Sequence, residues 1–482
     1  MAEKQHQQQQ QDPSQKKEPD PTEWDSPDDP ENAWNWQRGR KIWNTFVPTS
    51  IAFICTLASS IITPGRDSIQ SDFGVSSEVA LLPYVLYVLG LAAGPMSSAP
   101  CSETFGRRAS YLTGMPLFAI FTLGAGFSQS VASLSVCRFL SGVFGSPGLS
   151  IGSATISDIW APAERATPMA IYVLTPFLGP ALGPLIGGFV AQAKGWRWTM
   201  WVLLMFTLVA LLPAAFMHES YKAVLLKRRA KKRGLHYPGT ERTVAQSAKL
   251  FLKSTLTRPV HMFCVEPVVT CMTTYVAINF GMLYAFFAAF PYVFETSYGF
   301  GLGSTGLTFL GLGVEVLIGG GIIIWFSRFV FQRQAAQLRK AGRDPKVPPE
   351  NRLYIAMIGS VLLPCSLFMF GWSAQERVHW MCPIVAEALF GCGNLLIFMA
   401  SVMYVMDFYG PLYGASAMGA NNLARYTLGA VFPWFIVQMY SSLGIGWATS
   451  LLGFVSLALT PIPWVFYAYG PRLRARSKYV KK

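Results

Sequence analysis

Charged residues are scarce in this chain of 482 residues. Asp, Glu, Lys and Arg make up 13% of it, whereas a soluble domain carries about 25%. Hydrophobic residues make up 52% of the chain and aromatic residues 14%. The composition therefore argues against a soluble globular domain and is typical of a chain that lies mostly within a lipid bilayer.

The sequence also lacks the usual signatures of nucleotide and metal binding. No Gly-Lys dipeptide occurs, so the phosphate-binding loop of ATPases is absent and we expect no bound ATP. The five histidines form no ligand cluster, and the eight cysteines show no paired metal spacing. We therefore expect no cofactor and no metal site, and we interpret most cysteines as small core residues rather than a disulfide framework.

The N-terminal segment differs from the rest of the chain. It is polar, it contains a run of glutamines at 7–11, and it has no recognisable cleavable signal peptide. Segments with so few apolar residues bury too little surface to fold. We expect residues 1–42 to form a disordered cytoplasmic tail.

One apolar run contains residues that soluble helices reject. The segment Leu178–Phe189 holds two Gly-Pro pairs and a Gly-Gly. In a soluble helix interior proline costs about 3 kcal/mol and glycine about 1 kcal/mol. Membrane helices tolerate both when neighbouring helices bond the freed backbone groups and pack closely against the bare surface. The segment therefore predicts a bent, tightly packed transmembrane helix, as a moving membrane protein requires and a simple anchor does not.

The apolar runs predict an all-α polytopic membrane protein with twelve transmembrane helices. A spanning helix needs about 20 mainly apolar residues. A polar insert at 218–265 separates an N-terminal half at 43–217 from a C-terminal half at 266–469, and a basic tail follows at 470–482. Six helices in each half suggest the two parallel repeats of secondary transporters. The predicted spans are 43–63, 81–98, 110–128, 131–155, 167–190, 197–217, 266–290, 304–328, 353–372, 381–406, 413–440 and 447–469.

Lysine and arginine predict how the chain is oriented. If the N-terminus is cytoplasmic, the cytoplasmic segments hold all but six of the 39 Lys and Arg, which is the positive-inside bias. We therefore expect a multi-pass protein of the plasma membrane with both termini and the insert cytoplasmic. The basic cluster Lys227–Arg233 is interpreted as a segment beside anionic lipid, so no nucleic-acid partner is expected. The six exceptions are Arg66, Lys194, Arg197, Arg377, Arg138 and Arg425.

Arg138 lies within the predicted fourth helix. An ionisable side chain inside a bilayer costs on the order of 3 kcal/mol, which makes it a functional candidate. Gly142, Gly145 and Gly152 follow at +4, +7 and +14 and share its helical stripe. A positive charge above a groove without side chains leaves room for a ligand or a partner helix. The alternative is an arginine that merely pairs with a carboxylate or with backbone carbonyls.

A polar stripe follows the predicted tenth helix, where Glu387, Asn394 and Ser401 recur every seven residues. Such a stripe is too costly to face lipid, so we expect it to face the bundle interior or a cavity. Glu387 can exchange a proton. The alternative is a hydrogen-bond ladder between helices, in which case the proton site would lie at Glu315, Asp158 or Asp407.

Two further helices carry candidates for a substrate cavity. In the predicted seventh helix Tyr275, Asn279, Met282 and Phe286 lie at 0, +4, +7 and +11, which places them on one polar and aromatic face. Such faces also arise from simple packing, and that alternative stays open. Arg425 lies midway along the predicted eleventh helix and is a second charge within the bilayer.

Several sequence motifs resemble those of one transporter family. They make the chain similar to the major facilitator superfamily, specifically the fungal twelve-span drug:proton antiporter group, which includes multidrug and polyamine exporters. The resemblance covers Asp29 to Arg474 and implies the major facilitator fold. The matching motifs are Pro30–Trp36, Gly94–Arg108, Leu134–Gly142, Gly179–Gly188, Tyr284–Pro291, Pro349–Leu353, His379–Pro383 and Ala415–Arg425.

The resemblance implies roles for single residues. In the family, the loop between helices two and three locks the cytoplasmic side through charge pairs and helix dipoles. The fourth-helix arginine, Arg138 here, is linked to proton coupling, and the fifth-helix motif accompanies antiporters. The cytoplasmic gate would comprise Gly94, Glu103, Gly106, Arg107 and Arg108. The antiporter motif would comprise Gly179, Pro180, Gly183, Pro184, Gly187 and Gly188.

We predict an exporter that exchanges protons for a small organic compound by alternating access of the two halves. By resemblance, helices one, four, seven and ten line the cavity, and an aromatic drug or secondary metabolite is the expected cargo. Export of a polyamine or an organic acid is the alternative within transport. A sensor that binds without transporting is an alternative of another class, and a membrane enzyme would need a metal-binding cluster that the sequence lacks. The expected partners are the substrate, protons and the lipid bilayer, with the protein as a monomer.

Overall fold

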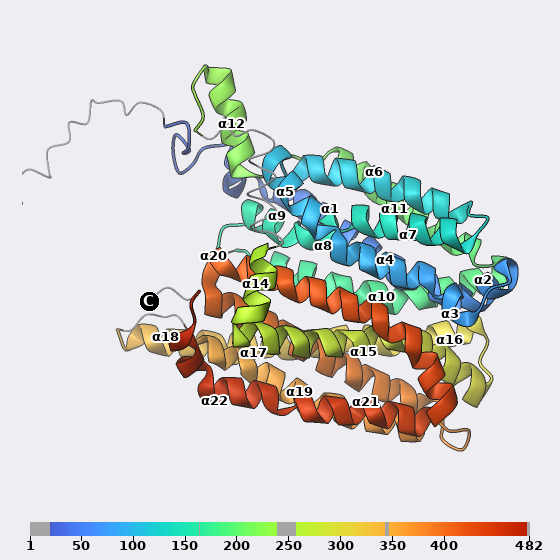
Figure 1. Ribbon diagram of the computed structural model, residues 1–482. Helices are drawn as coiled ribbons and strands as arrows, with labels where there is room; N and C mark the ends of the chain where they lie inside the picture. The colour runs from blue at the N-terminus through green and yellow to red at the C-terminus, as the bar shows by residue number, and fades with distance from the viewer. Residues whose placement is uncertain (1–19, 163, 239–256, 343–346, 480–482) are drawn as a thin grey trace, which may run out of the picture.

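The computed structural model describes residues 20–162, 164–238, 257–342 and 347–479. Within these ranges every regular element is a helix and there is no strand. Figure 1 shows the long helices side by side in two groups, with the N-terminal half in blue to green and the C-terminal half in yellow to red. The predicted all-α membrane fold is confirmed.

Kinks divide several helical rods in the N-terminal half. A break at Gly94 separates α4 from α5, and short turns join α7, α8 and α9 into one continuing path. The helices of this half are α1 (Arg38–Ser60), α2 (Arg66–Phe73), α3 (Ser77–Ala80), α4 (Leu82–Ala93), α5 (Pro95–Phe105), α6 (Arg107–Gly126), α7 (Val131–Gly145), α8 (Pro147–Ser150), α9 (Gly152–Ile159), α10 (Ala166–Lys194) and α11 (Arg197–Ala215).

The C-terminal half follows two shorter helices of the central insert, α12 (Lys222–Arg233) and α14 (Arg258–Val265). Its longest element, α20, is broken at Gly410, whose backbone angles of φ 67° and ψ −175° are not helical. Glycine adopts such a positive φ without a steric penalty. The helices of this half are α15 (Pro267–Tyr298), α16 (Leu302–Thr308), α17 (Leu310–Phe326), α18 (Gln332–Lys340), α19 (Leu353–Ser373), α20 (Met381–Leu443), α21 (Ile445–Leu459) and α22 (Pro461–Arg476).

Ten helical segments in the described residues are long and apolar enough to cross a membrane, and eleven if the bent pair α4–α5 counts as one span. The twelve spans expected from the sequence also require the part of α20 that follows Gly410. This part is helical but less apolar. Its lower hydropathy is explained by Asn421, Asn422 and Arg425, which lie in its middle.

Helix α10 carries the Gly-Pro run and remains one continuous helix despite Pro176, Pro180 and Pro184. Each proline lacks an N–H, so it leaves the carbonyl four residues earlier without its helical partner. The carbonyl freed by Pro184 is that of Pro180, and the Ser60 hydroxyl of α1 donates to it at 3.2 Å. A neighbouring helix thus satisfies a freed backbone group, as the sequence predicted.

The glycines of α10 allow close approach on two opposite faces. Gly179, Gly183 and Gly187 face α1, and a Cβ placed on Gly183 would lie 3.0 Å from the backbone nitrogen of Ile61. Gly188 faces the other half of the protein, where its Cβ would lie 2.5 Å from the Leu302 carbonyl oxygen at the start of α16. Helix α10 therefore packs within its own half and also across the junction between the halves.

The segment before α1 is ordered further toward the N-terminus than expected. Residues 20–37 form turns and a short 3-10 helix, and α1 begins at Arg38, inside the range 1–42 expected to be disordered; residues 1–19 lie outside the described part. Arg229 of α12 bonds Asp29 at 2.6 Å and Glu31 at 2.7 Å, so ion pairs order this segment. The Arg229 guanidinium also lowers the pKa of Asp29.

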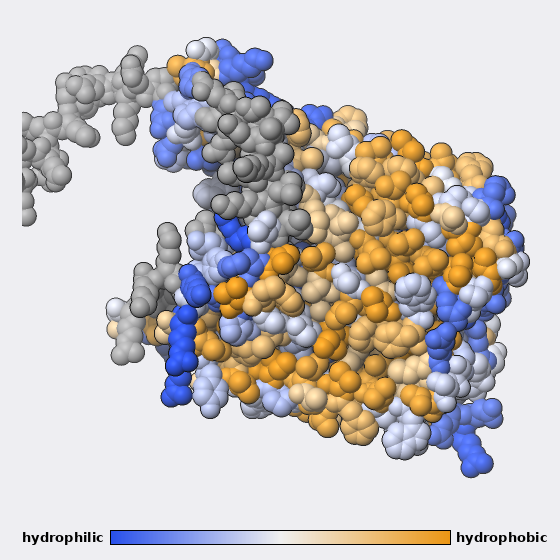
Figure 2. Space-filling view, viewed as in Figure 1, coloured by the Kyte–Doolittle hydropathy of each residue, from blue (hydrophilic) through white to orange (hydrophobic). Residues whose placement is uncertain are grey.

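The outer surface matches a protein that spans a bilayer. Figure 2 shows apolar side chains over the sides of the helical bundle and hydrophilic side chains gathered toward its two ends. Helix α12 and the end of α22 lie at the same end of the molecule (Figure 1). Large apolar side chains are exposed along the long helices, among them Val209, Leu212, Leu317, Trp325, Phe454 and Leu457.

Candidate functional site

Arg138 is fully enclosed at the centre of the N-terminal half. Its side chain is 0% exposed, it donates to the Ala58 carbonyl of α1, and its guanidinium lies 4.1 Å from the ring centre of Tyr87 on α4. Its Nε and Nη1 have no hydrogen-bond partner among the described residues. The sequence left open whether this arginine merely pairs with a carboxylate or with backbone carbonyls. The structure shows a carbonyl contact and, within the described chain, no carboxylate partner.

Arg425 is held by aromatic rings in the other half. Its guanidinium lies 4.6 Å from the ring centre of Phe280 on α15 and 4.7 Å from that of Phe398. It donates to the Asn422 side chain at 3.0 Å, while its Nε lacks a partner in the described residues. Cation–π contacts stabilise a desolvated cation by about 2 kcal/mol, so the rings compensate part of the burial. Arg138 in one half and Arg425 in the other thus lie buried against aromatic rings.

The predicted face of the seventh helix is buried along α15. The Asn394 side chain donates to the Asn279 carbonyl at 2.8 Å, which joins this face to α20. The Asn279 side-chain amide, the Tyr275 hydroxyl and the Ser401 hydroxyl have no partner among the described residues. Unpartnered buried polar groups cost about 1–3 kcal/mol each, so such a cluster indicates a place prepared for a ligand or for water.

Two residues of that face have different surroundings. The Phe286 ring stacks with Phe290 and meets Phe390 of α20 edge to face, with ring centres 4.7 Å apart in both pairs. Met282 is fully buried in the same hydrophobic core. Packing is therefore their visible role in this structure, as the alternative interpretation of the face allowed.

Glu387 is also buried, and its carboxyl oxygens have no hydrogen-bond partner in the described part of the chain. Glu315 of α17 is equally buried, and its Oε2 is likewise unpartnered. Because ionised carboxylates require water or a partner, these two groups are costly to bury in the ionised form. The structure therefore brings Glu315, an alternative proton site, to the same helix interface as Glu387.

The two halves close over these buried groups. The Tyr84 hydroxyl of α4 donates to the Tyr284 carbonyl of α15 at 3.1 Å, and the two rings stack with centres 6.3 Å apart. At the junction of α10 and α16, a Cβ on Gly306 would lie 2.6 Å from the Pro184 carbonyl oxygen. Backbones of opposite halves therefore touch, and the buried groups are shielded from solvent in this conformation.

A network of charges fixes the start of α6, at the end of the molecule where α12 lies. Arg107 pairs with Asp158 of α9 at 2.9 Å, and Glu219 accepts bonds from the backbone N–H groups of Arg107 and Arg108 at 2.9 and 3.2 Å. A carboxylate at a helix N-terminus is favoured by the unpaired N–H groups and by the helix dipole. Gly106 precedes the helix at φ 101°, and any Cβ there would overlap the Glu219 carboxylate.

The remaining predicted gate residues occupy different positions. Gly94 lies in the kink between α4 and α5, where a Cβ would overlap the Ser146 side chain. Glu103, which the resemblance placed in the lock, is exposed and forms no ion pair among the described residues. The acidic partners of the loop are Asp158 and Glu219 instead, and only the first of these was noted from the sequence.

A matching ion pair in the other half was missed by sequence reasoning. Arg352, immediately before α19, pairs with Asp407 near the break in α20 at 3.0 Å. The pair of Arg107 and Asp158 has the same form. Its arginine begins α6, and its aspartate lies near the end of α9, where the continuing path of α7, α8 and α9 ends. The sequence did contain a signal for this pair: Arg352 belongs to the motif Pro349–Leu353 before α19, and Asp407 lies in the following helix, α20. The repeated arrangement agrees with two related halves.

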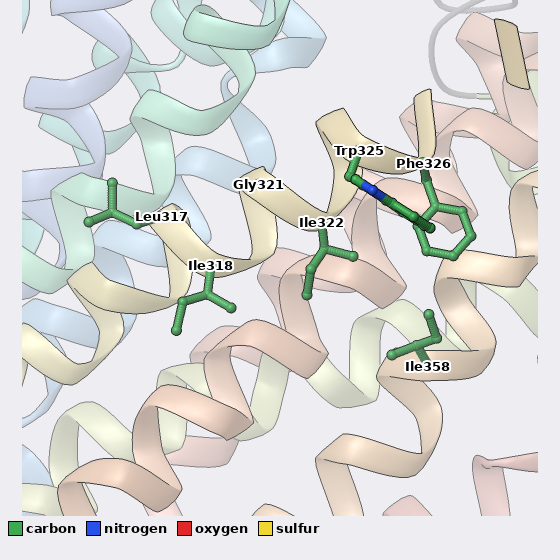
Figure 3. A pocket seen from close by; sticks show the side chains of 7 residues that line it. All are labelled: Leu317, Ile318, Gly321, Ile322, Trp325, Phe326 and Ile358. Atoms are coloured by element: carbon green, nitrogen blue, oxygen red, sulfur yellow. The ribbon is translucent and has the colours of Figure 1, made fainter. Parts of the chain in front are cut away.

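A shallow hollow of about 520 Å³ lies on the outer surface, and none of the site residues described above lines it. Figure 3 shows that α17 supplies most of its lining and that Ile358 of α19 completes it. The lining is apolar and lies on the surface suited to lipid, so we assign this hollow no role in substrate binding. Its lining residues are Leu317, Ile318, Gly321, Ile322, Trp325, Phe326 and Ile358.

Comparison with known proteins agrees with this geometry. The family model described as Major Facilitator Superfamily matches residues 49–433. The chain is 38% identical to Polyamine transporter 4 of Saccharomyces cerevisiae, over 95% of this chain and 73% of that protein. It is 39% identical to MFS-type transporter traF of Penicillium crustosum, over 95% of this chain and 93% of that protein. It is 34% identical to Efflux pump radE of Floropilus chiversii, over 97% of this chain and 87% of that protein.

Solved structures give the same fold at low sequence identity. A D-xylose-proton symporter aligns with a TM-score of 0.67 at 16% identity, over 88% of this chain and 97% of that chain. A peptide transporter aligns with a TM-score of 0.64 at 15% identity, over 90% of this chain and 95% of that chain. These structures are similar to this chain in fold alone.

Proposed function

Because this chain belongs to the major facilitator superfamily of membrane transporters, we propose that it exports a small organic compound in exchange for protons. The observation that carries the proposal is the Glu387 carboxyl, which is 1% exposed and unpartnered in the described chain. A carboxyl that is so poorly solvated binds and releases its proton according to whether water reaches it, and alternating access changes that exposure.

The cargo is proposed to be a neutral or anionic aromatic compound, such as a drug or a secondary metabolite. Arg138 and Arg425 place two fixed positive charges in the interior, and both lie against aromatic rings. Rings beside a cation favour a flat ligand that stacks on them or carries negative charge. The name Efflux pump of one relative is consistent with export.

Export of a polyamine is the second candidate. One relative is named Polyamine transporter 4, and Glu315 and Glu387 are two buried carboxyls that cationic cargo would need. The two arginines oppose this candidate because they repel a polycation. Competition distinguishes the candidates: spermidine should not inhibit the flux of an aromatic substrate if the first proposal holds.

Flux into sealed vesicles tests the proposal. The purified protein is reconstituted in liposomes, and transport of neutral, anionic and polycationic fluorescent or radiolabelled compounds is followed with and without a pH gradient. We expect uphill movement of at least one aromatic compound only with the gradient, accompanied by proton flux in the opposite direction. Binding without flux for every compound would identify a sensor, and flux in the same direction as protons would identify a symporter.

The proposed topology places both termini and the insert in the cytoplasm of a plasma-membrane protein. Epitope tags inserted after Leu235 and at the C-terminus should be protected from protease added to intact cells. They should be cleaved after the membrane is permeabilised, because the protease then reaches the cytoplasmic side. Cleavage of either tag in intact cells would contradict the topology.

A further inference from the structure

Helices α17 and α20 meet along a face where each of two acidic side chains is packed on a glycine of the opposite helix. A Cβ on Gly311 of α17 would lie 3.2 Å from Oε2 of Glu387, and a Cβ on Gly391 of α20 would overlap Oε2 of Glu315. Gly311 and Glu315 are one helical turn apart, as are Glu387 and Gly391. The two carboxyls therefore occupy neighbouring levels of one interface, each in space that the opposing glycine leaves free.

Neither carboxyl is paired with a cation in the described part of the chain. The other charged residues of α20 are Asp407, which pairs with Arg352, and Arg425, which lies against Phe280 and Phe398. Glu315 is 2% exposed and acts on Glu387 as a like charge. Cys392 of α20 is a further ionisable group near Glu315. The neighbouring helices α4, α16 and α19 contain no Asp, Glu, Lys or Arg, while α10 and α15 carry only Lys194 and Glu295, each in the last turn of its helix.

We propose that Glu315 and Glu387 form a single proton-binding unit, a carboxyl pair in which one proton is retained when the other is released. This inference rests on the proposed proton exchange and names its site. Two buried carboxylates without a cation cannot both be ionised, because each adds to the cost of the other. The protons of such a pair leave in two separate steps that belong to the pair and not to either residue.

The position of the pair explains how a proton controls the conformation. Helix α17 also lies against the other half, since a Cβ on Gly320 would be 3.3 Å from the Leu174 side chain of α10. Release of the proton to water leaves one negative charge in an apolar interface at this junction. The charge favours the conformation that admits water to the pair, and reprotonation permits the closed conformation seen here.

Carbodiimide labelling tests the pair without knowledge of the cargo. Dicyclohexylcarbodiimide reacts with protonated carboxyls in apolar surroundings, and mass spectrometry of the purified full-length protein locates the adduct at each pH. We expect labelling at Glu387 in the wild type to persist to a pH at least about one unit higher than in Glu315→Gln, because the pair retains its last proton more tightly. Glu295→Gln, a matched carboxyl replacement on α15, should leave the profile unchanged.

An unchanged Glu387 profile in Glu315→Gln, with Glu387 still labelled, would overturn the pair. The absence of labelling at both residues would overturn it as well. Packing provides an independent check: Gly391→Ala displaces the Glu315 carboxyl and should change the labelling profile. Gly313→Ala of α17 should not, because a Cβ at Gly313 meets no atom within 4 Å.

Flux measurements separate this inference from the proposed function. With any transported compound, Glu315→Gln and Glu387→Gln should each lose gradient-driven export and retain exchange of cargo for cargo. Loss in Glu387→Gln with full export in Glu315→Gln would reject the pair while leaving proton antiport intact. A wild type that transports without any response to the gradient would reject antiport, while the labelling result would still decide whether the carboxyls share a proton.

Discussion

Replacing Gly188 with leucine is expected to abolish export while the protein accumulates normally in the membrane. Gly188 lies on the face of α10 that touches α16 of the other half, where a Cβ would be 2.5 Å from the Leu302 carbonyl oxygen. A backbone carbonyl group of a helix cannot move aside as the end of a flexible side chain can. A leucine therefore prevents the halves from closing at this junction but leaves the packing within each half unchanged.

The experiment compares Gly188→Leu with two other leucine substitutions at matched protein levels. Gly183→Leu inserts its side chain between α10 and α1 of the same half, where overpacking costs about 1–3 kcal/mol or more. That variant should lose thermal stability and abundance as well as export. Gly313→Leu, on an open face of α17, should retain all three. Normal flux in Gly188→Leu would show that transport does not require the halves to close at this contact.

The distinction between Gly183 and Gly188 could not be predicted from the sequence. Glycine spacing indicates that a helix packs closely, and the contacts of α10 agree with this. It does not tell which neighbour each face meets. In the structure, the face of Gly183 belongs to the interior of one half, so we expect the surface that changes between conformations to be that of Gly188 and Gly306.

Local patterns predicted the buried polar groups better than their partners. Arg138, Asn394 and Glu387 each interrupt a long apolar run. Because polar atoms are costly in lipid, such residues are expected to be buried within the protein. The contact between Arg107 and Asp158 joins residues 51 positions apart, and periodicity within one helix contains no information about it. The same holds for Glu315, whose relation to Glu387 depends on the register of two packed helices.

The ordered segment before α1 illustrates a second limit. Its composition is that of a disordered tail, because few of its side chains can form a hydrophobic core. Asp29 is nevertheless buried against Arg229, 200 positions later in the chain. The segment is therefore ordered by bidentate ion pairs with the basic helix α12 and not by burial of hydrophobic side chains. Composition alone could therefore not reveal which part of the tail is structured.

Replacing Arg138 with alanine or lysine is expected to eliminate most gradient-driven transport without loss of protein. Two of its three guanidinium nitrogens lack partners in the described chain, so the cost of burying this charge is only partly compensated. Removing the charge relieves that cost, which offsets the stability lost with its contacts. What is lost is the bond to Ala58 and the stacking on Tyr87, which tie α7 to α1 and α4. A charged hydrogen bond contributes about 1.5–3 kcal/mol. We expect the bond to stabilise the state through which gradient-driven transport passes, and about 1.36 kcal/mol corresponds to tenfold in rate, so transport should fall by about tenfold or more.

Lysine is the informative replacement because it keeps the charge and loses the planar guanidinium. An ammonium group is more strongly hydrated and cannot stack flat on Tyr87 while donating to Ala58. If geometry matters, Arg138→Lys should be as defective as Arg138→Ala in gradient-driven flux, with both near wild-type abundance. If charge alone matters, lysine should restore most of the flux. Wild-type rates in Arg138→Ala across a pH gradient would exclude this arginine from proton coupling and leave the carboxyls of α17 and α20 as the candidate coupling groups.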